Sequence, residues 1–348
     1  MDKIKLTSYS HGAGCGCKLS PAILSDILSG AFEKPDSTKL LVGNNTRDDA
    51  AVYALTDEMC LVSTTDFFMP IVDDPYDFGR IASANAISDV YAMGGKPIIA
   101  LAILGWPIQV LSAEIANRVI NGARAVCSEA GIILAGGHSI DAPEPIFGLA
   151  VNGIVNREHV KRNSDGREGD VLFLTKKLGV GILTTAEKKR LLLQEDEGIA
   201  ARQMVQLNKI GEALARIDGV HAMTDITGFG LLGHLLEMAE GSGLGAEIYK
   251  DRVPIIRPSL PYYIEKGCVP GGMIRNWNSY EQKIWGISGK DQDSIILSDP
   301  QTSGGLLVSV ATSAIPKVQE LFNQAGYNEF MEPIGRLVSD HSGIVKIV

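Results

Sequence analysis

Along this chain, short apolar runs typical of strands alternate with segments whose apolar residues have helical spacing. Glycine stands at the end of many of these segments. In the first half, the pattern predicts strands over 60–65, 98–104 and 146–155, and helices over 78–93 and 113–130. Gly94 and Gly95 are expected to end the first helix, while Ser112 and Gly131 are expected to flank the second. The run at 98–104 has no polar position, which predicts a buried strand.

The second half of the chain repeats this alternation. It predicts strands over 171–175 and 220–223, helices over 200–217 and 231–240, and further strands up to Val348. Residues 156–170 are charged and have no apolar period, so we expect a domain boundary there. The first 45 residues are rich in Gly, Ser and Lys, which predicts a loosely held segment. The expected parts are a mobile arm at 1–45, an N-terminal domain at 46–156 and a C-terminal domain at 157–348.

Composition narrows the class of protein. A chain of 348 residues, 45% of them apolar, is long enough for two packed cores. The net charge of −9 argues against a nucleic-acid partner, which would require a basic face. The longest apolar run, 98–104, is too short to span a bilayer, so we expect no membrane partner. These features fit a cytoplasmic enzyme whose thiols are kept reduced.

Near its start the chain carries the sequence His-Gly-Ala-Gly-Cys-Gly-Cys-Lys at residues 11–18. A thiol reacts as the thiolate, and the cation of Lys18 favours that charged form at Cys15. The flanking glycines let a substrate approach closely, so the segment is a candidate for sulfur or selenium chemistry. Two other interpretations stay open: a flexible arm with inert cysteines and, less favoured, a structural zinc site, which lacks a second Cys/His pair. The other cysteines are expected to be small buried hydrophobes: Cys60, Cys127 and Cys268.

Several aspartates stand where a metal ion and a polyphosphate can be held together. They either precede a strand-like segment or close a predicted strand: Asp48, Asp49, Asp66 and Asp225. Asn85 and Asp89 are four residues apart on a predicted helix and therefore share one face. Each aspartate taken singly is better explained as a turn or cap residue. Because Mg²⁺ prefers carboxylate oxygens together with phosphates, the set as a whole favours a site for Mg²⁺ and a polyphosphate.

Glycine-rich stretches offer weaker evidence. No P-loop motif occurs, since Pro97 stands where that motif requires Ser or Thr. Residues 228–233 match G-x-G-x-x-G, but Asp225 lies where a pyrophosphate would bind, so we interpret these glycines as packing and turn residues. Residues 136–139 follow a predicted strand and form either a phosphate-binding turn or an ordinary one. Residues 299–307 are expected to form a tight loop that leads into a buried strand.

Taken together, the segments that carry these residues resemble the selenophosphate synthetase (selenide, water dikinase) family. The combination of Cys-Gly-Cys-Lys at 15–18 with Asp-Pro-Gln-Thr-Ser-Gly-Gly-Leu at 299–306 is highly specific, and the likeness covers nearly the whole chain. The matching segments are 10–18, 43–51, 63–72, 85–97, 135–148, 223–234 and 299–307.

This resemblance implies an α+β fold of the aminoimidazole ribonucleotide synthetase group, with two domains. Strands of the N-terminal half would enter a β-barrel shared across a homodimer, and the C-terminal half would be an α/β sandwich-like domain. The family reaction converts selenide, ATP and water into selenophosphate, AMP and orthophosphate. The resemblance therefore implies Mg²⁺ as a cofactor and ATP and selenide as substrates, and it leaves room for a selenium-delivery protein as a partner.

The resemblance also implies roles for individual residues. Cys15 matches the catalytic Cys or selenocysteine, Cys17 a dispensable second cysteine, and Lys18 a catalytic lysine that contacts ATP. The implied metal ligands are Asp49, Asp89 and Asp225. The implied ATP-contacting residues are Lys18, Thr46, Arg47, Asp48, Asp66, Asp89, Gly137, His138 and Ser139.

Two alternatives stay open. A related ATP-dependent enzyme, such as a thiamine-phosphate kinase or a hydrogenase-maturation protein, would share the fold but would not need a thiol in the arm. A redox or metal-delivery module would use Cys15 and Cys17 but would leave the aspartates without a role. AMP as the nucleotide product would support the dikinase, whereas ADP as the final product would indicate a simple kinase.

Overall fold

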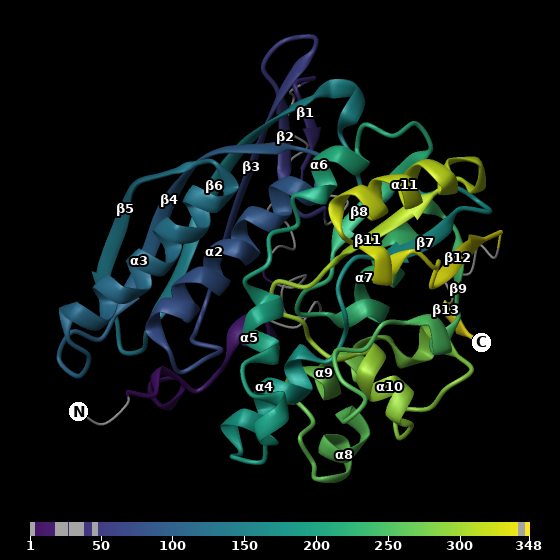
Figure 1. Ribbon diagram of the computed structural model, residues 1–348. Helices are drawn as coiled ribbons and strands as arrows, with labels where there is room; N and C mark the ends of the chain where they lie inside the picture. Colours follow the sequence, from purple (N-terminus) through teal and green to yellow (C-terminus); the bar gives the residue numbers. More distant parts are fainter. Residues whose placement is uncertain (1–3, 18–26, 28–37, 44–47, 340–344) are drawn as a thin grey trace.

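The computed structural model describes residues 4–17, 27, 38–43, 48–339 and 345–348. Within them, each half of the chain forms one β-sheet with helices around it, which confirms the expected α+β class (Figure 1). The first sheet has the order β1-β2-β3-β6-β4-β5 and is antiparallel except between β4 and β5. Its strands are β1 (Leu40–Val42), β2 (Ala51–Ala54), β3 (Met59–Phe68), β4 (Lys96–Trp106), β5 (Ile133–Asp141) and β6 (Ile146–Asn156).

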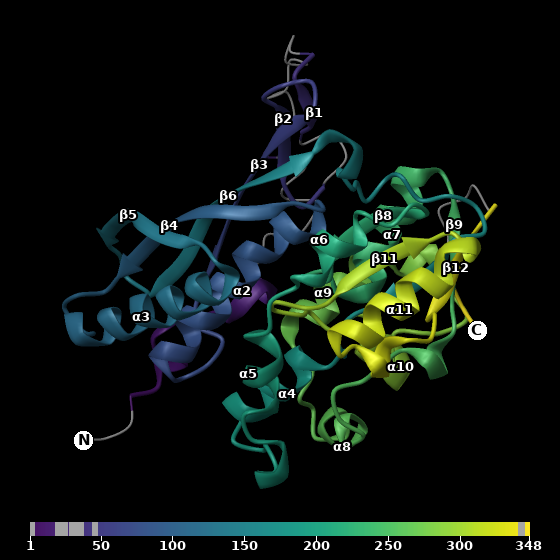
Figure 2. The ribbon, with the colours of Figure 1, turned by 45° about the horizontal axis from the view of Figure 1, so that its top comes forward.

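Two long helices cover one face of this sheet (Figure 2). They are α2 (Pro75–Ala92) and α3 (Ala113–Ala130). The side chain of Asp74 caps α2 by accepting hydrogen bonds from two backbone N–H groups of its first turn, and Gly94 follows its end with φ +76°. Helix α3 begins after Ser112 and ends at Gly131 in a left-handed conformation. Both predicted helices are present. The second has its expected limits, whereas the first begins three residues before the expected start at 78.

The second sheet has the order β10-β13-β9-β12-β7-β11-β8 and mixes parallel and antiparallel pairs. Its strands are β7 (Val171–Leu174), β8 (Val220–Asp225), β9 (Gly245–Ile248), β10 (Ile284–Trp285), β11 (Leu306–Val310), β12 (Gly335–Val338) and β13 (Val345–Ile347). Strand β11 is buried along its whole length, as expected for the strand that follows the loop at 299–307.

The helices of this half are α4 (Val180–Lys188), α5 (Ile199–Met204), α6 (Ile210–Leu214), α7 (Gly230–Ser242), α8 (Leu260–Glu265), α9 (Gly271–Tyr280), α10 (Gln292–Leu297) and α11 (Ile315–Ala325). The prediction of one helix over 200–217 is wrong, because the chain leaves the helix between α5 and α6. At this break the Nδ2 of Asn208 donates to Ser88 Oγ at 2.7 Å and to the Gly304 carbonyl at 2.8 Å. Long-range hydrogen bonds thus override the local apolar pattern.

Several helices were not indicated by the apolar pattern, namely α4, α8, α9, α10 and α11. Each has at most 11 residues, which is too short to show a clear helical period of apolar positions. Short 3-10 turns connect other elements: η1 (Leu6–Tyr9), η2 (Gly14–Cys17), η3 (Arg157–His159), η4 (Gln194–Asp196), η5 (Lys250–Arg252), η6 (Glu281–Lys283), η7 (Thr312–Ala314) and η8 (Asn328–Phe330).

The face of the first sheet that α2 and α3 leave uncovered carries exposed apolar side chains. Phe67 on β3 is 50% exposed, and Ile99 and Leu101 on β4 are 37% and 42% exposed. The prediction of a buried strand at 98–104 is therefore wrong for one face, although Ala100 on the other face is buried. A continuous apolar run is equally typical of a strand that packs against helices on one side and against another chain on the other.

Residues 136–139 form a strand, so the expectation of a turn is wrong, while their contact with phosphate stays a prediction. They lie inside β5 at the edge of the sheet and are exposed. A Cβ atom on Gly137 would stand 2.1 Å from the Ala102 carbonyl oxygen, and the pairing register shifts between Ala100 and Ala102. The glycines therefore allow a close, irregular strand pairing.

The described part of the arm, residues 4–17, lies against the body of the protein. Leu6 is buried, and the backbone N–H of Gly14 donates to the Met69 carbonyl at 3.0 Å. The mobility of the arm and the limits of the three expected parts stay predictions. The two halves meet where α2 packs against β8, α5 and α6. None of the described helices combines the length and the apolar content needed to cross a membrane.

Candidate active site

Three of the implied ligands, Asp49, Asp89 and Asp225, come together where the two halves meet. Asp49 precedes β2, Asp89 lies on α2, and Asp225 is the last residue of β8. Thr224 Oγ1 donates to Asp49 Oδ1 at 2.9 Å, which ties the N-terminal segment to β8 across 175 residues of sequence. Asp89 and Asp225 are 8% and 2% exposed, so the cluster is held by packed elements rather than by surface loops.

The electrostatics of this cluster favour a cation. Burial raises the pKa of Asp49 well above its usual value of 3.8, and the charges of Asp225, Asp89 and Asp48 raise it further. Asp49 Oδ2 is buried and has no hydrogen-bond partner among the described residues. Carboxylates that repel one another and leave an acceptor oxygen unused are stabilised by a positive ion between them.

Mg²⁺ fits this donor set. Among the described residues, no three His, Cys, Asp or Glu side chains form a preformed metal cage. Mg²⁺ does not require one, because it is usually bound by one or two carboxylates together with waters and substrate phosphates. The residues that would hold it are Asp49, Asp89 and Asp225.

Asp48 and Asp66 lie beside this cluster and have structural contacts of their own. The backbone N–H of Asn163 donates to Asp48 Oδ1 at 2.8 Å, which connects Asp48 to the segment between the two sheets. Asp66 lies within β3, two residues before its end, rather than closing the strand. Its Oδ2 accepts a hydrogen bond from Asn85 Nδ2 at 2.7 Å.

Cys15 is buried at the same junction, in the turn η2. Its backbone N–H donates to Thr302 Oγ1 and its Sγ donates to Asn85 Oδ1, both at 3.2 Å. Gly14 adopts φ +51°, and a Cβ atom there would stand 2.4 Å from Thr302 Oγ1, so only glycine fits. The glycines beside Cys15 thus form part of a tight turn. Asn85 lies one helical turn before Asp89 on α2, and it thereby connects the thiol with the aspartates.

The loop at 299–305 forms the floor of this site and is almost completely buried. Ser303 has a left-handed backbone with φ +50°, and its N–H donates to Asn85 Oδ1 at 2.8 Å. Burial raises the pKa of Asp299 to about 8, although hydrogen bonds from Gln301 and from backbone N–H groups oppose this shift. The Oδ2 of Asp299 accepts hydrogen bonds from the Gly181 N–H at 2.9 Å and from Gln301 Nε2 at 2.7 Å, so the side chain connects this loop to α4.

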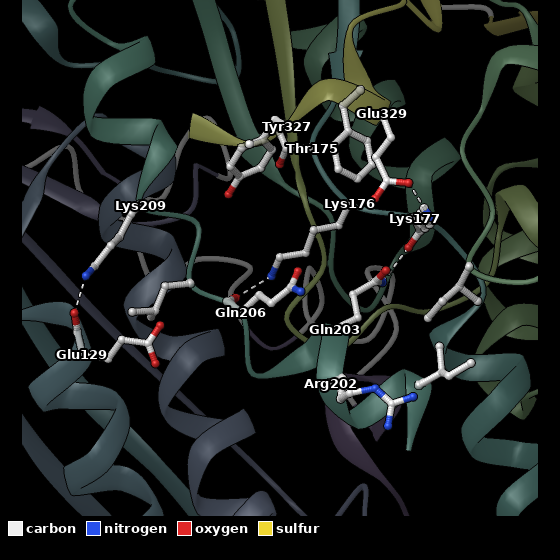
Figure 3. Close-up of a pocket in the computed structure, with 15 residues that line it drawn as sticks. Glu129, Thr175, Lys176, Lys177, Arg202, Gln203, Gln206, Lys209, Tyr327 and Glu329 are labelled. Carbon is white, nitrogen blue, oxygen red and sulfur yellow. Dashed lines mark hydrogen bonds and ion pairs between the residues drawn. The ribbon is translucent and has the colours of Figure 1, made fainter. Parts of the chain in front are cut away.

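Sequence reasoning missed Lys176, which follows β7 and is 3% exposed. Its Nζ donates to the carbonyls of Gln206 at 2.7 Å and Ser303 at 2.8 Å. Burial lowers the pKa of Lys176 to about 7, and the charge of Asp225 offsets part of that shift. Figure 3 shows the side chain extended toward Gln206 in a cavity of about 640 Å³. A lysine directly after an apolar strand was the available signal.

The remaining implied residues fall into two groups. Lys18, Thr46 and Arg47 lie outside the described residues. Gly137, His138 and Ser139 lie on the exposed edge strand β5, whereas Asp66 lies on β3, three strands away. These two strands are therefore not neighbours in the sheet.

Comparison with known proteins gives the family. Models of AIR synthase related proteins match residues 47–155 with their N-terminal domain and residues 167–348 with their C-terminal domain. A selenide, water dikinase of Pseudomonas putida is 57% identical over 347 residues, which cover 100% of this chain and 99% of that protein. One of Yersinia pseudotuberculosis is 58% identical over 347 residues, covering 99% and 98%. The chain belongs to the selenide, water dikinase family.

Solved structures show that this selenide, water dikinase family member has a fold found in other enzymes. A thiamine-monophosphate kinase from Stenotrophomonas maltophilia matches with a TM-score of 0.64 at 20% identity, covering 90% of this chain and 92% of that one. A hydrogenase maturation protein HypE in complex with ATP matches with a TM-score of 0.65 at 19% identity, covering 99% and 94%. These identities establish the fold alone, and the expected aminoimidazole ribonucleotide synthetase-like architecture is confirmed.

Proposed function

We propose that this chain converts selenide, ATP and water into selenophosphate, AMP and orthophosphate. The observation that carries the proposal is the junction on α2, where the thiol of Cys15 contacts Asn85 and the carboxylate of Asp89 follows one turn later. A related kinase would need the aspartates but not a buried thiol beside them. The names of the relatives at 57% and 58% identity support the same activity.

In this proposal Asp49, Asp89 and Asp225 hold Mg²⁺, and the charge repulsion within the cluster supports that role. When bound, Mg²⁺ would neutralise charge on the phosphates of ATP during transfer. The residues proposed to contact ATP are Lys18, Thr46, Arg47, Asp48, Asp66, Asp89, Gly137, His138 and Ser139. Phosphoryl transfer depends mainly on positioning and charge, so a rigid, buried cluster suits it.

The chain's own residues then orient the reactants. Asn85 accepts a hydrogen bond from the Cys15 thiol and donates one to Asp66, so it sets the distance between the thiol and a carboxylate. Cys15 is 1% exposed, and this burial keeps water from the thiol. Lys18, three residues further on, would bring positive charge to the transferred phosphoryl group. Selenide would enter through the cavity of about 570 Å³ beside this turn. It would arrive either free in solution or bound to a selenium-delivery protein.

We also propose a homodimer in which the first sheets of two copies close a barrel. The exposed Phe67 and Leu101 support it, since an apolar sheet face of this kind favours association. Asp66, Leu149, Ala102 and Gly137 form one row across the sheet. Three spacings of about 4.8 Å separate its ends, roughly 14 Å in all. A second copy would then supply Gly137, His138 and Ser139 to the nucleotide.

The test is an anaerobic incubation with ATP and Mg²⁺, with and without selenide, followed by identification of the nucleotide product. We expect selenide-dependent AMP from the wild type and from Cys17→Ser, and none from Cys15→Ser, because a hydroxyl does not supply a thiolate near neutral pH. Circular dichroism checks that each variant is folded. ADP as the final product would instead indicate a simple kinase, and full activity of Cys15→Ser would remove the thiol from the mechanism.

A further inference from the structure

A buried lysine is connected to the thiol through hydrogen bonds at both ends of one residue, Ser303. Lys176 Nζ donates to the Ser303 carbonyl at 2.8 Å, and the Ser303 N–H donates to Asn85 Oδ1 at 2.8 Å. The same Asn85 oxygen accepts the hydrogen bond from Cys15 Sγ. Lys176, Ser303 and Cys15 are 3%, 1% and 1% exposed, so water does not compete for these contacts at the surface.

The backbone of Ser303 makes the first two of these hydrogen bonds. Its φ of +50° lies in the left-handed region, which residues other than glycine rarely adopt. Such a backbone conformation persists only where neighbouring groups enforce it. Asn85 holds the Ser303 N–H on one side of the strained torsion, and Lys176 holds the Ser303 carbonyl on the other. The Ser303 hydroxyl is buried and has no hydrogen-bond partner in the described chain, so the side chain does not stabilise this backbone.

The neighbouring residue of the loop holds the other anchor of the thiol. Thr302 Oγ1 accepts the backbone N–H of Cys15 at 3.2 Å. Relaxation of Ser303 would therefore disturb both contacts of Cys15 at once, the one through Asn85 and the one through Thr302. The Nζ of Lys176 also donates to the Gln206 carbonyl at the break between α5 and α6, and this second hydrogen bond restricts the position of the ammonium (Figure 3).

We infer that Lys176 is a positioning residue that holds the left-handed Ser303 backbone and thereby orients Asn85 and the Cys15 thiol. It does so through two backbone carbonyls and does not touch the reactants. The inference rests on the proposed role of Cys15 in the reaction, but the contacts themselves are independent of that role. The adjacent Lys177 differs in this respect, since its ammonium pairs with Glu329 at 2.6 Å on the other side of the cavity.

The experiment measures how fast iodoacetamide alkylates Cys15, located by peptide mass mapping in a Cys17→Ser background. It needs no turnover, so its outcome stands apart from that of the AMP assay. In Lys176→Met we expect alkylation about tenfold faster than in the parent, because the loop and turn open locally more often. Cys127, 1% exposed within α3, reports any general loosening and should keep its rate. Lys177→Met is the matched control and should label as the parent does.

A rescue variant separates positioning from simple packing. Glycine adopts φ +50° without a clamp, so Lys176→Met/Ser303→Gly should recover most of the protection of Cys15. If Lys176→Met does not fold, Lys176→Gln takes its place with the same expectation. Unchanged labelling of Cys15, equal gains at Cys15 and Cys127, or no rescue by Ser303→Gly would each overturn the inference. Failure of both Lys176 variants to fold would do so as well, since Lys176 would then be a general structural residue.

Discussion

Replacing Asp49 by Asn should make the metal-free protein more stable and the enzyme much slower. Asn keeps the Oδ1 that accepts from Thr224 and removes a charge that Asp225, Asp89 and Asp48 repel. Relief of such repulsion typically contributes about 1 kcal/mol to the free energy of unfolding. For a chain of this size that corresponds to a rise in Tm of roughly 2 °C.

The sign of this effect depends on pH. The pKa of Asp49 is raised in the folded protein, so below its usual value of 3.8 the carboxyl is protonated in both the folded and the unfolded state. As the pH rises above that value, the unfolded state loses its proton first, and the folded state loses stability relative to it. The advantage of Asp49→Asn should therefore be absent at low pH and should grow toward neutral pH.

Mg²⁺ should reverse the order of stability. A ligand at 100 times its Kd stabilises the state that binds it by about 2.7 kcal/mol, which exceeds the gain of about 1 kcal/mol from removing the charge. We therefore expect wild type to melt above Asp49→Asn in Mg²⁺ and ATP, and below it in EDTA. The rate of AMP formation should fall roughly a hundredfold, because a group that holds the metal contributes several kcal/mol to transition-state stabilisation.

The assay is differential scanning fluorimetry in EDTA and in Mg²⁺ with ATP, together with AMP formation at limiting Mg²⁺. Asp57→Asn, which removes the same charge from an exposed position, is the control and should leave Tm and rate unchanged. A lower Tm of Asp49→Asn in EDTA at neutral pH would refute the repulsion argument. An unchanged response to Mg²⁺ would refute the assignment of Asp49 to the metal site.

Two further predictions concern the buried loop and the exposed sheet face. Burial raises the pKa of Asp299 from 3.8 to about 8, so the folded protein should lose stability as the pH rises from the first value to the second. In thermal melts Asp299→Asn should lose less stability over this range; parallel curves would contradict this. Phe67→Asp places a charge on the proposed dimer face and should give a folded monomer by sedimentation velocity, whereas Leu191→Asp, at an exposed apolar position of the C-terminal half, should stay dimeric. A wild type that sediments as a monomer at micromolar concentration would remove the basis of this prediction.

Elements with strong local signals were predictable from the chain. Helices α2 and α3 are both followed by glycines, so their ends follow from nearby residues, whereas only α2 has a side-chain cap at its start. Strands β3, β6, β7 and β8 are apolar runs between turn residues. The sequence also indicated Cys15 and the aspartates as candidate site residues. Cys15 lies between two glycines, and most of the aspartates stand next to strand-like segments.

Other features depend on contacts between distant parts of the chain. The break before α6 exists because Asn208 reaches Ser88 and Gly304, which are 120 and 96 residues away. The exposed side of β4 could not be told from a buried one, since an apolar run does not say what covers it. Residues 136–139 look like a turn, but pairing with β4 extends them into a strand.

The sequence by itself therefore determined the elements with strong local signals and the chemical groups of the candidate site, since each rests on local spacing or on residue type. Only the tertiary structure decided which of these groups meet. Cys15 and Thr302 are 287 residues apart in sequence and hydrogen-bonded in the fold, and Lys176 gains its link to the thiol through Ser303. The physical reason is that burial and charge coupling are properties of packed neighbours, which local spacing does not specify.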